Sequence, residues 1–496
     1  MLAQKFMIKI AASIVSTLFM LISLLVMTRY VGYEYGVMMG GWALVGLINT
    51  ISDLGFDTAS VKFISQGKDQ NTCISTHLFL KSVLVGIMVL ITIAYLSVSI
   101  LAGSISPENT TIIILFMVYY AVADLVWVVI RAFDGRLEAA KSSVIQASDA
   151  GMRSLVLIVL ALYGSSAAVL SAGYVAGAAF SVLVALYLFR KVGYRPVRPS
   201  YLKDYIVYAK PIVVGVLLVA AISFVDKVIV GFFWNSAELG YYTVALGVAY
   251  AATAIGVAIN YLLLPKFSEL FSAGDWDSVK STLWGAEKYI SILFLPAVIF
   301  VMVFGDSLVT AVFGTGFSPA GEVLSILSVY IYLYLMVGIL TQVLYSTGNN
   351  KLYRNATIIF SVSTFALLIA LVPNNIGGLE LAGMGASGAA VSLAAGYLIY
   401  AAAIHCYVKV STKLSLHKGL ARQFLAGAAV FAAAFFIRGM GPFGPLPLML
   451  LLLMCFALFL ALLFILKEMN KGDLLFILRT LNPKNAYDRS NDENGR

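Results

Sequence analysis

Asp149 and Arg153 stand four residues apart in an apolar stretch of the sequence. At this spacing, two side chains lie on the same face of a helix and can form an ion pair. A charged side chain inside a membrane is costly unless it has a partner or faces a cavity. Two interpretations remain open. Either the pair only links helices, or Arg153 faces a cationic cavity and binds a phosphate group through its planar guanidinium.

Three further charges interrupt apolar stretches in the same way. Asp124 lies in the middle of one stretch, and Asp226 and Lys227 are adjacent in another. Neighbouring side chains diverge by about 100° around a helix, so Asp226 and Lys227 are not expected to point the same way. Lys227 is a second candidate phosphate donor. Asp124 is also a candidate partner for Arg153, because it is predicted on the preceding helix.

Other residues that often do chemistry give weaker signals. Asp53 and Asp57 are expected to cap a helix end or to pair with Lys62. The sequence has no catalytic constellation, so we expect a transporter rather than an enzyme, with no cofactor. The histidines and cysteines are too dispersed to predict a metal site or a disulfide framework. They are His77, His405, His417, Cys73, Cys406 and Cys455.

The elements that carry these charges are predicted membrane helices. The 496 residues are 61% hydrophobic and 11% charged, with a mean hydropathy of +0.94, which is far from the balance of a soluble protein. Apolar runs of about twenty residues, enough to cross about 30 Å of hydrocarbon, recur along the chain. We therefore predict an all-α polytopic membrane protein with about 14 transmembrane helices. The predicted spans are 10–28, 36–59, 82–102, 111–130, 144–163, 167–189, 206–233, 241–264, 289–313, 323–345, 356–372, 383–406, 424–437 and 446–466.

Basic residues predict the orientation of these helices. With the N terminus in the cytoplasm, 29 of the 33 Lys and Arg residues fall on the cytoplasmic side. Arg29 and Arg438 fall outside, and Arg153 and Lys227 fall within spans. This asymmetry predicts that both termini are cytoplasmic. It also accounts for the net charge of +9 without any binding of nucleic acid.

A repeat and a basic loop divide the chain into two halves. Glu34 and Gly36 recur as Glu238 and Gly240, both at an offset of 204 residues (238 − 34 and 240 − 36). The loop 190–203, which contains two prolines, separates two sets of six spans. We therefore expect two pseudo-symmetric six-helix lobes related by an axis along the membrane normal. The expected divisions are 1–195, 196–410, the last two helices in 411–467, and a cytoplasmic tail in 468–496, whose start at 471–481 could form an amphipathic surface helix.

Several stretches resemble a known family of transporters. The stretches are RYVGYEYGVMMGGWALVGLINTISDLGFDTASVKFIS, FVDKVIVGFFWNSAELGYYTVALGVA, LPKFSELFSAGDWDSVK and FLPAVIFVMVFGDSLVTAVFGTGFSPAGEVLSIL. They are similar to the polysaccharide-biosynthesis flippases of the O-antigen type, which share the fold of the multidrug-extrusion (MATE) transporters within the MOP exporter superfamily. The resemblance covers most of the chain up to about Cys406 and is weaker in the last two spans.

This resemblance implies a function and a set of partners. It implies alternating-access movement of oligosaccharides linked to polyprenyl phosphate or pyrophosphate, from the cytoplasmic to the outer leaflet of the plasma (inner) membrane, for surface polysaccharide or glycoprotein glycan biosynthesis. It adds Arg29 to Arg153 and Lys227 as a phosphate-facing candidate. Its expected partners are the lipid-linked oligosaccharide, membrane lipid, and a glycan polymerase or glycosyltransferases. The apolar last two spans suit a lipid tail or simple packing.

Two alternatives stay open at this point. One is a cation antiporter of the multidrug-extrusion type, many of which use an acidic residue in the first helix, whereas 10–28 has none. The other is a membrane scaffold for glycan enzymes, which does not need buried charges. For a transporter, the energy source is either a proton or sodium gradient acting through a cavity carboxylate or the membrane potential. The candidate carboxylates are Asp124, Asp149 and Asp226.

Overall fold

The computed structural model describes residues 2–210, 212–441, 443–470, 472 and 473, and these residues are almost entirely helical. Apart from residues 472 and 473, the predicted surface helix at 471–481 and the tail beyond it lie outside the described residues. Twelve of the described helices are long and apolar enough to cross a membrane, which confirms an all-α polytopic membrane protein. The main helices are α1 (Leu2–Asn49), α2 (Phe56–Ser65), α3 (Gln70–Leu101), α4 (Pro107–Gly135), α5 (Ala139–Leu162), α6 (Ala167–Phe189), α7 (Leu202–Ala209), α8 (Val213–Phe233), α9 (Ser236–Ser272), α10 (Trp276–Phe313), α11 (Pro319–Ser346), α12 (Asn350–Leu371), α13 (Gly385–Thr412), α14 (Leu420–Arg438) and α15 (Pro445–Ile465).

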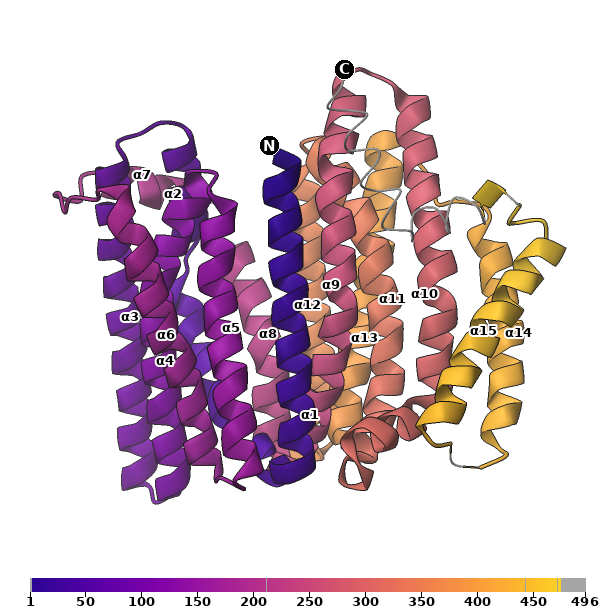
Figure 1. The fold of residues 1–496 in the computed structure, drawn as a ribbon, viewed down its shortest axis with the longest axis horizontal. Helices are drawn as coiled ribbons and strands as arrows, with labels where there is room; N and C mark the ends of the chain where they lie inside the picture. Colours follow the sequence, from indigo (N-terminus) through magenta and orange to yellow (C-terminus); the bar gives the residue numbers. More distant parts are fainter. Residues whose placement is uncertain (1, 211, 442, 471, 474–496) are drawn as a thin grey trace.

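The first two predicted spans form one element, α1. Its backbone leaves the helical conformation at Val31, with φ −139° and ψ 42°, where the chain reverses direction. In Figure 1, α1 descends from the N terminus, turns at the lower end of the bundle and rises again. We call the end where α1 begins the N-terminal end, and the end with the Val31 turn the opposite end.

The second predicted span is interrupted at the N-terminal end of the bundle. A short 3₁₀ turn occupies Thr50–Ser52, and Gly55 takes a left-handed conformation with φ +91° before α2 begins. Asp53 accepts a hydrogen bond from the Gly55 amide at 3.0 Å, so it stabilises this break as predicted for a helix-end cap. The break separates α2 from α1 and lets α2 pack against α3 and α4.

Polar residues begin several of the long helices. Asp69, Ser106, Asn235 and Asp275 each accept a hydrogen bond from a backbone amide in the first turn of α3, α4, α9 and α10. Such caps satisfy amides that have no partner within the helix. The cap at Asp275 also explains why α10 begins before its predicted apolar span, in polar sequence ahead of Tyr289. At its other end, α9 continues beyond its predicted span to Ser272.

The two Glu-x-Gly motifs make matching contacts. The Glu34 carboxylate accepts a hydrogen bond from the Ala167 amide at 2.9 Å, at the start of α6. The Glu238 carboxylate accepts one from the Ala386 amide at 3.0 Å, at the start of α13. An acceptor with negative charge is favourable at a helix N terminus. The glutamate of each motif therefore caps the N terminus of the sixth predicted helix of its own half.

The segment that joins the two halves is tied to the first half. The amides of Arg195 and Val197 donate to the side chains of Asn71 and Ser75 on α3, both at 3.2 Å. On α7, the Tyr205 hydroxyl donates to the Cys73 carbonyl at 3.1 Å, and its ring is fully buried. The linker and α7 thus run along the N-terminal end of the first half, as Figure 1 shows on its left side.

The last two helices form a separate apolar layer. They pack against α10 through a second hydrophobic cluster that includes Phe300, Phe304 and Phe459. Their outer faces expose large apolar side chains such as Phe436 and Leu453, which suits contact with lipid. In Figure 1, α14 and α15 stand at the right edge of the bundle, on the side away from α3.

Candidate functional site

Arg153 borders a cavity of about 380 Å³ inside the first half. Helix α5 begins at Ala139, five residues before the predicted start, so Arg153 lies about 21 Å along it by helical rise. The glycine at position 177 makes room for it, since a Cβ on Gly177 would lie 2.8 Å from the Arg153 Cβ. The polar or aromatic residues of the cavity wall include Ser16, Tyr119, Trp127, Gln146, Asp149 and Arg153.

The predicted pair of Asp149 and Arg153 is present. Arg153 Nη1 lies 3.1 Å from Asp149 Oδ2 and donates a hydrogen bond to the Tyr119 hydroxyl at 2.9 Å. The guanidinium carbon lies 5.0 Å from the centre of the Tyr174 ring, within the range of a cation–π contact. Both polar contacts use Nη1. Among the described residues, Nε and Nη2 have no hydrogen-bond partner, which leaves two donors for an anion.

Arg29 lies far from this cavity, at the opposite end of the bundle. Its Nε donates to the Val312 carbonyl at 3.1 Å, and its Nη2 donates to the Ala311 carbonyl at 3.2 Å. These carbonyls end α10, where a cation is favourable because of the helix dipole. A second cavity of about 500 Å³ includes Arg29 in its wall. Arg29 therefore connects α1 to the second half, and the structure does not bring it together with Arg153.

Lys227 and Asp226 do point the same way, contrary to the prediction. Lys227 Nζ lies 3.1 Å from Asp226 Oδ1 and donates to the Ser223 carbonyl at 2.8 Å. The Tyr242 hydroxyl donates to Asp226 Oδ2 at 2.7 Å. The expectation was wrong because the long, flexible lysine side chain bends back along the helix. Both residues are buried, and Lys227 also belongs to the wall of a cavity of about 260 Å³, so its role as a phosphate donor stays a prediction.

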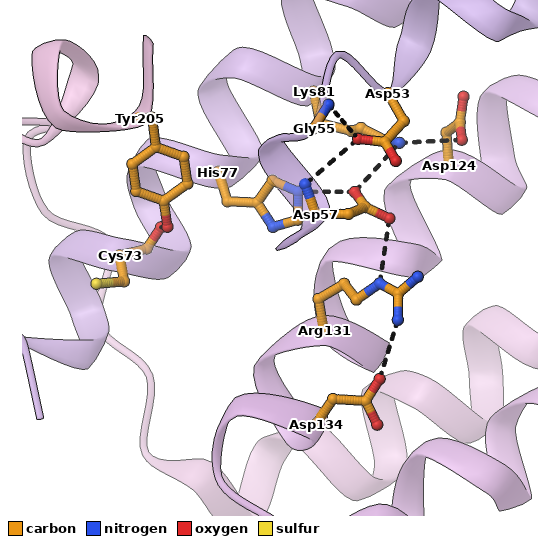
Figure 2. A network of polar contacts seen from close by, with 10 residues as sticks. All are labelled: Asp53, Gly55, Asp57, Cys73, His77, Lys81, Asp124, Arg131, Asp134 and Tyr205. Carbon is orange, nitrogen blue, oxygen red and sulfur yellow. Dashed lines mark hydrogen bonds and ion pairs between the residues drawn. The ribbon is translucent and has the colours of Figure 1, made fainter. Parts of the chain in front are cut away.

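Asp124 pairs with a lysine, not with Arg153. Its Oδ1 lies 3.3 Å from Nζ of Lys81, which is 2% exposed on α3. Lys81 directly precedes the predicted span 82–102, so the sequence analysis did not include it among the buried charges. Lys81 also lies 3.5 Å from Asp57, so Asp57 does not pair with Lys62 as expected. Figure 2 shows the resulting network between α2, α3 and α4.

This network reaches the cavity through one aromatic contact. Arg131 Nε lies 3.2 Å from Asp57 Oδ2, and its Nη1 lies 3.2 Å from Asp134 Oδ2. The guanidinium carbon of Arg131 lies 4.6 Å from the centre of the Trp127 ring. Trp127 belongs to the wall of the cavity that contains Arg153. The network therefore contacts the cavity wall through Arg131 and Trp127.

Residues 2–271 match the polysaccharide biosynthesis protein family. The chain belongs to this family. That match covers just over half of the chain, including all of the first half and the cavity around Arg153.

Known proteins of similar sequence and fold agree with this assignment. The chain is 23% identical over 341 residues to the probable low-salt glycan biosynthesis flippase Agl15 of Haloferax volcanii, covering 68% of this chain and 71% of that protein. Its fold is similar to that of the lipid II flippase MurJ in an inward closed conformation, with a TM-score of 0.72, 13% identity and coverage of 92% and 98% of the two chains.

A second solved structure shares the fold less closely. An inward-facing multidrug resistance MATE family transporter of the MOP superfamily has a TM-score of 0.64 and 14% identity, with coverage of 80% of this chain and 94% of that one. At these identities the likeness concerns the fold alone. The fold of this family member is therefore similar to that of MATE transporters, as the sequence predicted.

Proposed function

We propose that the protein flips oligosaccharides linked to polyprenyl phosphate or pyrophosphate from the cytoplasmic to the outer leaflet, for surface polysaccharide or glycoprotein glycan biosynthesis. The observation that supports this most is Arg153. It stands in a cavity within the bundle, fixed on one side by Asp149 and Tyr119. The other edge of its planar guanidinium can bind a phosphate oxygen pair. Membership in the family and the named functions of similar proteins support the same substrate class.

Movement of such a substrate requires access from one leaflet at a time. We propose that residues 1–195 and 196–410 act as two lobes that open alternately at the two ends. The matching Glu34 and Glu238 contacts support two equivalent halves. At the opposite end, α1 contacts the second half through Arg29 and through Gly36, which lies against Gly240. The present state is then one in which that end is closed.

We propose further that both termini lie in the cytoplasm of a cell whose plasma (inner) membrane holds the protein. Reporter fusions after Phe189 and after Leu466 should then report cytoplasm, and one near Asn109 should report the outside.

The apolar helices α14 and α15, in 411–467, are proposed to accommodate the lipid tail. A glycan polymerase or glycosyltransferases would use the exported product or supply the substrate.

Reconstitution of the full chain in vesicles tests the proposed function. A fluorescent short-chain polyprenyl-diphosphate oligosaccharide is incorporated into both leaflets when the vesicles are formed, and a membrane-impermeant reductant then bleaches the probe in the outer leaflet. We expect the protein to expose the inner-leaflet pool to bleaching. Transport of a cationic dye but not of the glycan lipid would instead identify an antiporter of the multidrug-extrusion type. Transport of neither would leave the scaffold alternative.

A further inference from the structure

Phe224 joins the two halves at the middle of the bundle. It lies halfway along α8, the first long helix of the second half. The centre of its ring lies 5.0 Å from that of Trp42 on α1 and 6.4 Å from that of Tyr120 on α4. Both distances are typical of attractive aromatic pairs. A side chain of the second half is thus held between two rings of the first half.

A glycine provides the space that this ring occupies. A Cβ on Gly46 would lie 2.3 Å from Phe224 Cε1 and 2.7 Å from the Tyr120 hydroxyl oxygen. Atoms overlap at such distances, so a side chain at position 46 would force the Phe224 ring out. The Tyr120 hydroxyl also donates to the Trp42 carbonyl at 3.4 Å. Trp42, Gly46 and Tyr120 therefore form a closed site for the ring, which we call the Phe224 notch.

The Phe224 notch lies between two cavities. Along α4, Ile113 belongs to the cavity of about 260 Å³ and Ala123 to the cavity of about 380 Å³, with Tyr120 between them. Along α8, Phe224 precedes Val228 of the smaller cavity by about one turn. Since α4 begins at the opposite end, the smaller cavity lies on the side of that end. The aromatic contact therefore separates the larger cavity from the opposite end.

A chain of contacts joins the Phe224 notch to Arg153. The ring centres of Tyr120 and Tyr119 lie 5.1 Å apart, and the Tyr119 hydroxyl accepts the 2.9 Å hydrogen bond from Arg153 Nη1. A phosphate bound to Nε and Nη2 attracts the whole guanidinium, and Nη1 moves with it because the group is planar and rigid. Movement of the guanidinium thus acts on Tyr119, and through it on Tyr120.

We propose that Phe224 is the gate residue between the two halves, and that a phosphate bound at Arg153 opens this gate through Tyr119 and Tyr120. The inference rests on the proposed transport function and assigns the step that links substrate binding to opening. In the closed state, Phe224 fills its notch and keeps the two cavities apart. When phosphate is bound, the ring leaves the notch, α8 separates from α1, and the cavities join into one path toward the opposite end.

Distances between spin labels test the gate without any glycan. The labels are attached through Tyr163→Cys and Leu379→Cys, at sites that are 84% and 72% exposed at the opposite end of the first and second halves. The exposed Cys406 is changed by Cys406→Ser, and the full chain is placed in lipid nanodiscs. Wild type should show one short distance. Farnesyl diphosphate, a short polyprenyl diphosphate without sugar, should raise the ratio of long to short distances at least about tenfold.

Two variants should open the gate without a ligand. Phe224→Ala empties the notch and Gly46→Ala blocks it, so both should raise the ratio of long to short distances at least about tenfold. Phe232→Ala, at a 78% exposed site on the same helix, is the control and should leave the ratio unchanged. Phe224→Leu gives the same test if Phe224→Ala does not fold. A packing role alone predicts lower thermal stability without opening, and a wild-type ratio in either gate variant overturns the proposal.

Tyr119→Phe tests the connection to Arg153. This variant keeps the ring next to Tyr120 but lacks the hydroxyl that accepts the hydrogen bond from Arg153. It should stay closed without ligand, as wild type does. Radiolabelled farnesyl diphosphate should still bind, but the opening that it causes should be at least about tenfold weaker. Opening that is absent in wild type, or undiminished in Tyr119→Phe, overturns the coupling.

The flipping assay separates this proposal from the proposed function. Phe224→Ala should flip the fluorescent glycan lipid at least about tenfold more slowly than wild type, because its halves rarely return to the closed state. Wild-type flipping by Phe224→Ala would show that transport does not need the gate. If wild type flips no glycan lipid, the proposed function fails, while the label distances still decide whether Phe224 holds the halves together.

Discussion

Gly36 and Gly240 lie backbone against backbone where the two halves meet. A Cβ added to Gly240 would lie 3.5 Å from the Cα of Gly36, which is an ordinary van der Waals distance. The residues hold equivalent positions in the two Glu-x-Gly motifs. Equivalent residues that contact each other must lie close to the axis that relates the halves, as in a two-fold interface. This contact therefore supports the proposed axis between the two halves, at the opposite end of the bundle.

The surroundings of these two glycines differ, so we expect alanine at each position to have a different effect on stability. A Cβ on Gly36 would lie 2.1 Å from the Ser236 carbonyl oxygen, so the backbone must shift. We expect Gly36→Ala to lower the free energy of unfolding by about 1–3 kcal/mol, as overpacking does. Gly240→Ala meets no such atom and should be neutral, which makes it the control. Thermal unfolding in detergent measures both, and equal losses would contradict the close contact at Gly36.

Substitutions of Arg153 should affect transport more than folding. Arg153→Lys should reach the membrane at a normal level but flip the glycan lipid at least about tenfold more slowly, because an ammonium cannot bind two phosphate oxygens in one plane. Arg153→Ala should transport less and also lose about 1–3 kcal/mol of stability, since it leaves Asp149 without its partner.

The double variant Arg153→Ala, Asp149→Asn separates these two effects. Removal of the unpaired carboxylate should restore stability, while transport stays low. The flipping assay and the expression level are measured together. Normal glycan flipping by a well-expressed Arg153→Ala would show that Arg153 serves only the ion pair.

Glu34 and Glu238 should contribute equally to stability. Each accepts a hydrogen bond from the first amides of a long helix, α6 or α13. Replacement of either with alanine should cost about 1 kcal/mol, the usual effect of losing an N-terminal acceptor. The effects should add in the double variant, because the two contacts lie on different helices. Chemical denaturation measures this, and a loss confined to one of the two variants would argue against equivalent halves.

The segment after α15 should detach from α10 in acid. Burial raises the pKa of Asp473, but hydrogen bonds from Lys288, the Asn470 amide and Tyr289 outweigh burial and lower it. A lowered folded pKa stabilises the docked segment fully above the ordinary Asp pKa of about 3.9, and this stabilisation is lost as the pH falls further. Hydrogen exchange in this segment should therefore rise in acid. Asp473→Asn should show the faster exchange already at neutral pH.

Local patterns in the sequence predicted the helices and one ion pair. Long apolar runs identify membrane helices because the bilayer imposes their length and polarity. Asp149 and Arg153 could be paired from the sequence since a spacing of four residues fixes their relative position on one helix. The positions of the helices were good to a few residues, except where polar sequence continued a helix or where a break divided a predicted span. Such breaks occur at Gly55 and between α7 and α8, where the predicted span 206–233 is helical only up to Ala209 and again from Val213.

The remaining contacts depend on how separate helices meet. Nothing in the sequence places Lys81 between Asp57 and Asp124, because these residues come from three different helices. The one local indication was that His77 and Lys81 stand four residues apart. Because they lie at the end of an apolar run, they were expected to be exposed at the membrane surface and not buried. Lys227 was misjudged for a different reason. Helical geometry fixes the direction of its Cβ but not that of the four carbons beyond it.

The tie between the linker and α3 has a mechanical consequence. Three groups of this stretch are hydrogen-bonded to α3: the amides of Arg195 and Val197 and the hydroxyl of Tyr205. This stretch therefore cannot extend when the second half rotates. If the two halves move as proposed, the pivot would therefore lie between Tyr205 and the start of α8. In that movement, a small tilt of α2 and α3 would be passed directly to α8 through this short connection.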